Sequence, residues 1–544
     1  MNLTNTQFVF QSKTKSVLIG GMVLGALCLI LTFIGDDEYH TRFWSNYLHN
    51  TVFFTGIAFT SMFFLSAQIT AFAGWNSLVK RVWESMSQFM MVGLVLVAVL
   101  VIGVWGHIHH LYHWNTPGIT DPNSPIYDHI IDGKSGFLNA RWYTLGTLGF
   151  LAVWFFWSFK LRQASIAQDT DETPSLDYYK KQRKWAASFL PLGGFLSTVF
   201  IWQSVMSIDP HWYSTMFAWY SMISMWLGGL SMTVMLIIYL KSQGYLEYVT
   251  RDHLHDIGKY LFGISVFWTY LWFDQFMLIW YANNGEETIY FKERMNHYPV
   301  LFWGNLLLNF VTPFLILMRN DTKRKFGTMF FVAVIVFFGH WWDYFYMIKP
   351  GARIAAHEAK EISEGKVKTH EATSLEKAAA EPKMTTTEAH SDATATATPA
   401  AEGEAAAHHE DAAAHAAAPA ETQEAPAQGE AAHAGNEHGE DVHGEDMHDE
   451  AAHAGTEHGE DVHGEEHGHE GDKSFKAGFT LPGFLELGTL IGFLSLFLFF
   501  FFNKLSSASL VPWKDPYLEE SKHHETGALI NTEVEESHGH DDHH

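Results

Sequence analysis

Aspartate and histidine residues lie at the ends of several long apolar segments of this chain. The clearest cases are SIDPHWYSTMFAWY at 207–220 and FDQFMLIWYANNGEE at 273–287, where acidic and imidazole groups stand among aromatic residues. Ionisable groups are costly in hydrocarbon, so they usually face the interior of a helix bundle or a polar cavity. Histidine titrates near neutrality, and a neighbouring carboxylate can exchange protons with it. The pattern predicts proton transfer, or the binding of a quinol headgroup, inside a membrane.

Seven residues from four apolar segments are expected to meet near one membrane surface. They are His107, His110, Asp209, His211, Asp274, His340 and Asp343. Asp274 stands out because its flanks, WTYLWF and QFMLIWY, contain no cation. His340 and Asp343 are about one turn apart, so they share a face of their helix. The pattern assigns no catalytic residue, and a structural hydrogen bond is the alternative role for each of the seven.

Other polar and aromatic residues near these positions have simpler explanations. His109 and His113 are expected to face lipid headgroups. Tryptophans near the candidates could form the walls of a quinol site, but at helix ends they usually anchor a protein at the membrane interface. Neutral polar residues occupy the opposite halves of the helices, and these are Gln68, Ser87, Gln88, Asn305, Asn309 and Thr312. They could line a water path, although such residues are typical of hydrogen bonds between helices.

A b-type haem is a competing role for the histidines. Its iron needs two histidines on facing helices at matched depth, and His107 or His110 together with His340 would meet that requirement. Gly106 and Gly339 precede candidate histidines and would allow a macrocycle to approach.

Composition argues against other redox centres in this chain. Cys28 is the only cysteine, and no CxxCH motif occurs, so the chain cannot supply a four-cysteine cluster or covalent haem. We expect it to bind no metal or cofactor itself, with quinol as the one candidate small molecule. The segment 352–473 contributes 7 − 29 = −22 of the formal net charge of −26. The acidity therefore belongs to one segment, and no nucleic-acid partner is expected.

Ten segments are apolar and long enough to cross the hydrocarbon core as helices, which takes about 20 residues. They are 16–34, 46–73, 86–113, 137–160, 185–206, 216–240, 259–282, 299–318, 327–348 and 479–502. The fifth is the least regular, because Pro191 and Gly193–Gly194 interrupt it. The chain is predicted to be an all-α polytopic membrane protein.

Basic and acidic loops alternate along the chain. Lysine and arginine gather at 80–81, 160–184, 241–251 and 319–325, whereas the loops between these positions are acidic. Basic loops tend to remain in the cytoplasm. Both termini are therefore predicted to be cytoplasmic, and the seven candidates should lie toward the outer surface.

Four regions are expected along the chain. These are a nine-helix membrane domain at 1–350, an insert at 351–475, the tenth transmembrane helix at 476–505 and a cytoplasmic tail at 506–544. The insert is rich in Ala, Glu, His and Gly and contains an internal repeat, so it cannot bury a core and is predicted to be disordered. It is also predicted to lie outside the cytoplasm. Its histidines could bind zinc, copper or nickel weakly or buffer protons, but a solvated repeat is the simpler interpretation.

Three strings of this chain resemble one known family. They are SIDPHWYSTMFAWY, LWFDQFMLIWYANNGEE and the pair PGFLELGTLIGFLSLF and LVPWKDPYLEES. They resemble the F subunit of bacterial alternative complex III, a quinol:cytochrome c oxidoreductase, and through it the NrfD-like membrane subunits of polysulfide reductases. The resemblance covers about 1–350 and 475–525. It implies two four-helix bundles, made of helices two to five and six to nine, with helices one and ten at the periphery.

The resemblance also implies a function. The chain would be a subunit of a quinol-oxidising electron-transfer complex in the bacterial cytoplasmic membrane. Its partners would be a sister NrfD-like membrane subunit, a multihaem cytochrome c, an iron–sulfur subunit, lipids and, in some assemblies, a terminal oxidase. Haem c and iron–sulfur clusters would belong to those partners. This chain would support the assembly and conduct protons through the candidate residues, without being catalytic alone.

Three other functions remain open. The chain could bind and oxidise quinol itself, anchor a b-type haem, or act as a secondary transporter. A transporter would have broken helices and inverted repeats at the membrane midplane, whereas the candidate residues here are predicted to lie near one surface.

Overall fold

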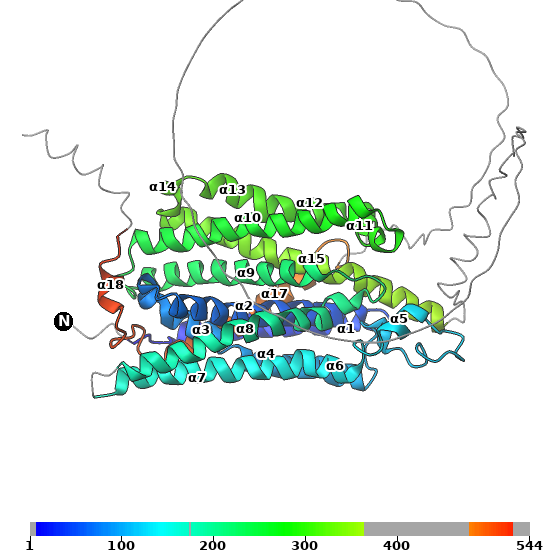
Figure 1. Cartoon of the computed structure of the whole chain (residues 1–544), viewed down its shortest axis with the longest axis horizontal. Helices are drawn as coiled ribbons and strands as arrows, with labels where there is room; N and C mark the ends of the chain where they lie inside the picture. Colours follow the sequence, from blue (N-terminus) through cyan, green and yellow to red (C-terminus); the bar gives the residue numbers. More distant parts are fainter. Residues whose placement is uncertain (1–6, 173–175, 364–477, 526–544) are drawn as a thin grey trace, which may run out of the picture. The chain divides into compact units, whose positions relative to one another are not determined.

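The computed structural model describes residues 7–172, 176–363 and 478–525 (Figure 1). Regular structure in these residues is helical, apart from isolated bridges such as the one between Gln7 and Ser509. Ten helical segments among them are long and apolar enough to cross a membrane. The prediction of an all-α polytopic membrane protein is confirmed. The histidine-rich repeat and its predicted disorder lie outside the described residues.

Six of the ten spans are single helices. They are α1 (Ser12–Ile34), α2 (Thr41–Thr70), α9 (Thr215–Ser242), α10 (Arg251–Ala282), α15 (Phe326–Ser363) and α17 (Phe484–Leu505). The other four spans are composite. They are η2, α3 and α4 (Gly74–Val79, Lys80–Ser87 and Met90–Trp105), α6, η4 and α7 (Ala140–Thr144, Leu145–Gly149 and Phe150–Thr170), α8 and η5 (Asp177–Ser204 and Met206–Ile208), and α12, η6 and α13 (Pro299–Leu306, Leu307–Val311 and Thr312–Leu317).

Short helices occupy the connections between spans. They are η3 (His113–Asn115), α5 (His129–Lys134), α11 (Gly285–His297), α14 (Asn320–Lys323) and α18 (Leu518–Lys522). Helices α5 and α11 lie at one end of the helical bundle and α18 lies at the other (Figure 1). We call these the α5 end and the α18 end. Gln7 pairs with Ser509 and donates a hydrogen bond to the Ser506 carbonyl, so both described chain ends lie at the α18 end.

The spans pack as two groups of four around α2. The first bundle consists of α2, the α3–α4 span, α7 and α8, and within it α2 contacts α3, α4 and α8. Helices α9, α10, α12–α13 and α15 form the second, and α2 also packs against α9 and α15. Because 89% of the most apolar part of α2 is buried, this helix is the seam between the bundles.

Helices α1 and α17 pair with each other beside this core. A Cβ atom on Gly25 would lie 2.3 Å from the Cα atom of Gly492, so only glycine permits this close crossing. The most apolar part of α1 is only 22% buried, in keeping with a peripheral position.

Two predicted boundaries are wrong. The third span was expected to reach residue 113, but α4 ends at Trp105, where the Gly106 N–H bonds to the Ile102 carbonyl and His107 turns to a positive φ of 48°. The disordered insert was expected to begin at 351, but α15 continues to Ser363. The fifth span is more regular than its sequence suggested, because α8 continues through Pro191.

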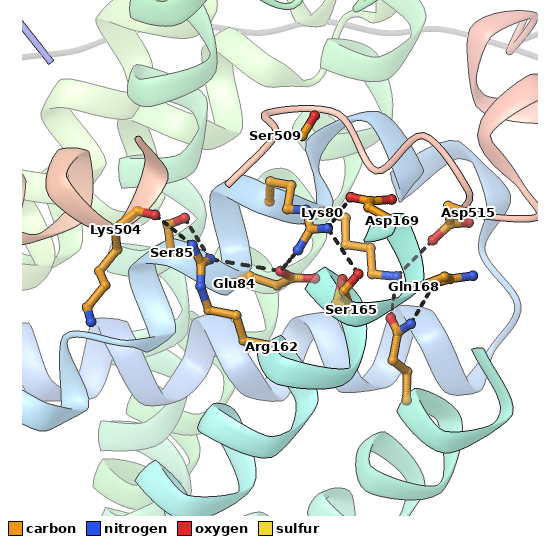
Figure 2. Close-up of polar contacts among 12 residues, drawn as sticks. Lys80, Glu84, Ser85, Arg162, Ser165, Gln168, Asp169, Lys504, Ser509 and Asp515 are labelled. Atoms are coloured by element: carbon orange, nitrogen blue, oxygen red, sulfur yellow. Dashed lines mark hydrogen bonds and ion pairs between the residues drawn. The ribbon is translucent and has the colours of Figure 1, made fainter. Parts of the chain in front are cut away.

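A network of buried ion pairs fastens the segment after α17 to the first bundle at the α18 end (Figure 2). Lys80 Nζ donates to Asp515 at 2.8 Å and to Gln182 at 2.7 Å. The two ends of the Arg81 guanidinium donate to Glu84 at 2.7 Å and to Asp169 at 2.6 Å.

Arg162 completes this network. It donates to the Lys504 carbonyl at 2.6 Å and lies 3.9 Å from Glu84. We call the six charged residues of this network the ion-pair lock. They are Lys80, Arg81, Glu84, Arg162, Asp169 and Asp515.

Candidate functional site

Asp343 of α15 lies at the centre of the second bundle and is completely buried. Its Oδ1 accepts hydrogen bonds from the Tyr220 hydroxyl and from Asn305 Nδ2. Its Oδ2 accepts from Ser224 Oγ at 2.8 Å and from Trp268 Nε1 at 3.0 Å. The donors come from α9, α10 and α12, so one carboxylate joins all four spans of the bundle. An ionised carboxylate has about four acceptor positions, and all four are filled.

His340 adjoins this carboxylate through a shared hydroxyl. Its Nδ1 lies 2.9 Å from Ser224 Oγ and 4.0 Å from Asp343 Oδ2. Since the single hydroxyl proton of Ser224 is directed to Asp343, Nδ1 must carry the proton of the imidazole. Nε2 is then a bare acceptor, and it has no hydrogen-bond partner in the described part of the chain. The histidine therefore presents a buried, open site for a proton.

Asn309 extends the cluster toward the α18 end. Its Nδ2 donates to Asn305 Oδ1 at 3.1 Å and to the Gly339 carbonyl at 3.0 Å. A Cβ on Gly339 would lie 2.1 Å from Asn309 Oδ1, so the glycine makes room for this amide. The two asparagines thus belong to the Asp343 cluster and form hydrogen bonds between helices, which was one of the two roles that their sequence positions allowed.

A second polar group lies further along α15, toward the α5 end. Arg294 of α11 is 1% exposed and donates to Asp209 Oδ2 at 2.9 Å. Its guanidinium carbon lies 3.4 Å from the centre of the Tyr290 ring, and Trp212 stacks on the other side of this tyrosine at 3.8 Å. A Cβ on Gly351 of α15 would lie 2.8 Å from both oxygens of the Asp209 carboxylate, so the backbone of α15 packs directly against this carboxylate.

A third group lies in the loops at the α5 end. His211 Nε2 is 2.7 Å from Asp128 Oδ2, and Asp128 also caps α5 by accepting the backbone N–H groups of Ile130 and Ile131. Burial alone would lower the pKa of His211, but the hydrogen bond that it donates to Asp128 and the nearby carboxylate charges raise it overall. The pKa of Asp128 is lowered, because its hydrogen bonds and the His211 charge outweigh the effect of burial.

Glu358 connects this third group to α15. Its Oε2 lies 3.5 Å from His113 Nδ1, and the His113 and His211 rings are 6.0 Å apart. We call the three groups together the α15 ladder. Its titratable and charged members are His340, Asp343, Arg294, Asp209, Asp128, His211, His113 and Glu358. From Asp343 to Glu358 the ladder covers 15 residues, or about 22 Å of helix.

The structure does not gather the seven predicted residues into one pocket. It brings His340 and Asp343 together, and it places Asp209 and His211 at successive positions of the ladder. His107 and His110 lie in the loop after α4 instead, because that helix ends at Trp105. His107 is exposed, and the His110 ring packs against Tyr39 at 4.5 Å.

The loop histidines also fail the requirement for a haem site. His107 and His110 are not on a helix, whereas His340 faces Ser224 and Trp268 inside the second bundle. The pairing proposed for a b-type haem is therefore not formed. His109, expected at the headgroups, is instead 4% exposed, and burial lowers its pKa to about 4. It is therefore neutral at physiological pH.

Asp274 is separate from the ladder. Its side chain is partly exposed on α10, among exposed residues that include Phe273 and Met277. Within the described residues it makes no hydrogen bond or ion pair. The expectation that Asp274 shares a pocket with Asp343 is wrong, because α10 reaches Asp343 through Trp268, and Asp274 lies about 120° around the helix from that residue.

Several residues of the ladder were not singled out from the sequence. Arg294 lies in a connection and meets Asp209 from 85 positions away. Tyr220 and Ser224 look like ordinary residues of an apolar helix, and only the crossing of α9 with α15 gives them a shared partner. Glu358 was assigned to the insert, whose composition concealed the extra turns of α15. An i, i+4 spacing of Tyr220 and Ser224 was the one available signal.

Carboxylates, imidazoles and hydroxyls follow one another along the ladder, and such groups can transfer protons. No group of three or more His, Cys, Asp or Glu residues is arranged to hold a metal ion in the described ranges. A surface cleft of about 370 Å³ lies on α10 near η2, and its lining, which includes Trp75, Asp256 and Lys259, contains none of the seven predicted residues.

No model of a known protein family matches this chain, and no curated protein matches it in sequence. The resemblance to the F subunit of alternative complex III therefore stays a prediction. One of the strings that carry it contributes to the ladder, since Asp209 and His211 belong to SIDPHWYSTMFAWY.

Proposed function

We propose that this chain is an integral membrane subunit of a quinol:cytochrome c, or quinol:oxidase, electron-transfer complex, and that it conducts protons along the α15 ladder. The resemblance of its strings supports the assembly. The observation that carries the proton-conducting role is the Asp343 cluster, in which one buried carboxylate is held by neutral donors beside an imidazole with an open nitrogen.

The cluster supports a stepwise relay. A proton that binds Nε2 of His340 makes the ring a cation, and the ring then releases its Nδ1 proton to Ser224 Oγ. Ser224 passes its own proton to Asp343 Oδ2, so one proton enters, one moves on, and the imidazole is neutral again. Tyr220 contacts the other carboxylate oxygen and provides the next hydroxyl toward the α5 end. The Arg294–Asp209 pair and the loop carboxylates follow along α15.

The partners of this proposal are those implied by the resemblance. A sister membrane subunit, a multihaem cytochrome c and an iron–sulfur subunit would hold the haem and the clusters, and a terminal oxidase would receive electrons in some assemblies. The membrane would be the bacterial cytoplasmic membrane, with both termini in the cytoplasm. The shared position of Gln7 and Ser509 at the α18 end agrees with an even number of membrane crossings.

A quinol-oxidising role for this chain alone has less support. In such a role, a quinol headgroup would bind beside one of the candidates His107, Asp209 and Asp274, but Asp209 is already paired with Arg294. The secondary-transporter alternative also has no specific observation in its favour.

The test has two parts, carried out on the complex purified in mild detergent. Identification of the co-purified subunits tests the assembly, which predicts a multihaem cytochrome and an iron–sulfur protein. Asp343→Asn then tests the proton path in proteoliposomes. We expect electron transfer to a soluble acceptor to continue while the rate of proton translocation falls by about 10²-fold, so that fewer protons cross the membrane per electron.

A matched control comes from the first bundle. Ser158 is equally buried and lies 2.8 Å from Ser87 and 2.7 Å from Gln88, so Ser158→Ala removes a buried polar group without touching the ladder. It should leave the proton-to-electron ratio unchanged. Equal ratios for wild type and Asp343→Asn in an intact complex would refute the proton-conducting role, and the absence of redox subunits would refute the assembly.

A further inference from the structure

One face of α10 is turned away from the rest of the described chain. Phe267, Tyr270, Phe273, Met277 and Tyr281 recur on it at intervals of three or four residues, and between 41% and 83% of each side chain is exposed. Asp274 lies on the same face, one turn after Tyr270. Exposed apolar side chains are expected where a helix meets lipid, but a carboxylate is not.

Two polar groups on this face have no partner within the described residues. The Asp274 carboxylate makes no hydrogen bond or ion pair, and the Tyr270 hydroxyl makes no hydrogen bond. Both belong to one stripe of α10, because residues four apart on a helix are neighbours. A binding partner for this stripe must therefore satisfy two polar groups about one helical turn apart.

The depth of Asp274 follows from its neighbours on α12. Phe302 contacts Trp272 at 4.9 Å and Phe276 at 6.4 Å, so it lies at the level of Asp274. The span Pro299–Leu317 has only 19 residues, which reach about 28 Å as a helix and so barely cross a hydrocarbon core of about 30 Å. Phe302 is the fourth of these residues, so it and Asp274 must lie inside the hydrocarbon boundary.

We infer that the α10 face carrying Tyr270 and Asp274 is the docking surface for a transmembrane helix of another protein, which presents a lysine or arginine to the Asp274 carboxylate. Charge complementarity argues for the basic residue, because a carboxylate at this depth is stabilised by an opposite charge. The position of Tyr270 argues for a helix over a lipid headgroup. It lies about 6 Å deeper than Asp274, beyond the reach of a headgroup at the surface, whereas a helix can contact both.

This inference goes beyond the proposed function and reassigns Asp274 from the proton path to an interface. Its test uses the full chain in its native membrane, with the photo-crosslinking residue p-benzoylphenylalanine at Phe273, which is 53% exposed. The matched control places the same residue at Ile102 of α4, which is 62% exposed. We expect the Phe273 adduct to contain a transmembrane segment with a lysine or arginine within one turn of the linked residue, and the Ile102 adduct to contain lipid.

Charge changes at Asp274 make the test specific. Asp274→Asn should lower the adduct yield about tenfold or more, and Asp274→Lys should abolish it. Changing the basic residue of the partner to aspartate should then restore the adduct with Asp274→Lys. Since Asp274 makes no hydrogen bond or ion pair within the described chain, these variants should keep the melting temperature of the wild type.

Three results would overturn the inference. These are an adduct at Phe273 that consists of phospholipid only, a partner segment without a basic residue at the contact, and a yield that Asp274→Asn does not change. The subunit identification tests the proposed function separately. A docked basic helix from a protein outside a redox complex would support this inference and refute the function, whereas redox subunits with a lipid-only adduct would do the opposite.

Discussion

The ion-pair lock and the Asp343 cluster are both buried in the helix bundles, but they balance charge in different ways. In the lock, three cations face three carboxylates across α3, α7 and the segment after α17 (Figure 2). In the Asp343 cluster, one carboxylate accepts hydrogen bonds from four neutral side chains, and the His340 imidazole lies 4.0 Å from it.

This difference decides whether a proton can move. Arginine and lysine only donate hydrogen bonds, so the lock has no arrangement that suits a protonated carboxylate. At Asp515, the charge and hydrogen bond of Lys80 outweigh burial and lower the pKa of the carboxyl. The hydroxyls beside Asp343 can instead rotate from donor to acceptor. The Tyr220 and Ser224 hydroxyls could therefore serve both states of the carboxyl group, which a relay requires.

The largest predicted effect tests the lock. Arg81→Met would leave Glu84 and Asp169 without the cation that contacts both, and breaking a buried pair in this way costs about 3–5 kcal/mol. We expect a loss of this size in the free energy of unfolding, measured by denaturation in detergent. The double variant Arg81→Met with Glu84→Gln should recover part of it, because it removes both charges.

A surface pair provides the control for this prediction. Lys180 is 67% exposed and lies 3.7 Å from Asp177, so Lys180→Met should change the unfolding free energy by less than about 0.5 kcal/mol. If the two single variants lose similar stability, the lock is not a charge-balanced structural element and the contrast with Asp343 fails.

The second prediction tests the relay by removing one hydroxyl. Ser224→Ala breaks the link between His340 and Asp343 but leaves both residues in place. The rate of proton translocation in proteoliposomes should fall by roughly 10²-fold, the scale of one proton-transfer step. Ser231→Ala is the matched control, because it removes a buried hydroxyl of the same helix that has no partner within the described residues. Equal effects of the two variants would exclude Ser224 as a relay.

The comparison also shows which features can be predicted from sequence. The spans were predicted well because long apolar runs leave little choice inside a membrane, as 299–318 against the observed Pro299–Leu317 illustrates. His340 and Asp343 were predicted to share a face because that depends only on helical periodicity. The position of His107 was not predicted, because α4 ends just before it and His107 itself adopts a left-handed conformation.

Partners from distant parts of the chain were the main omission. Asp209 was recognised, but Arg294 neutralises it from a connecting helix whose position depends on tertiary packing. Glu358 was missed because an Ala- and Glu-rich sequence fits both a helix and a disordered segment, and contacts such as that with His113 favour the helix. The unpartnered state of Asp274 likewise becomes visible only when every neighbouring helix is in place.

The third prediction asks whether the Arg294–Asp209 pair belongs with the lock or with the relay. Gly351→Ala would place a Cβ 2.8 Å from the Asp209 carboxylate oxygens, and overpacking of this kind typically costs about 1–3 kcal/mol. Gly327→Ala on the same helix is the control, since a Cβ there meets no atom within 4 Å. A loss of stability with an unchanged proton-to-electron ratio would class the pair as structural. A fall in that ratio would place it on the proton path.

The smallest predicted effect concerns the loop pair Asp128–His211, whose histidine loses its charge as the pH rises through its raised pKa. The pKa of His211 is raised from 6.5, so the pair adds stability that is fully present below pH 6.5 and is lost as the pH rises through the raised pKa. The pKa of Asp128 is lowered, so the carboxylate keeps its contribution until the pH falls through that lower value. The pair is therefore strongest in mildly acidic solution.

His211→Gln should lower the free energy of unfolding by about 1 kcal/mol in that range, because the two side chains are 22% and 11% exposed and solvent screens part of their attraction. The difference from wild type should disappear as the solution becomes alkaline. Asp128→Asn keeps an oxygen to cap α5 but removes the charge, so it should show the same pH profile. Melting temperatures measured across this pH range check both variants, and a pH-independent difference would mean that the pair acts through packing and not through its charge.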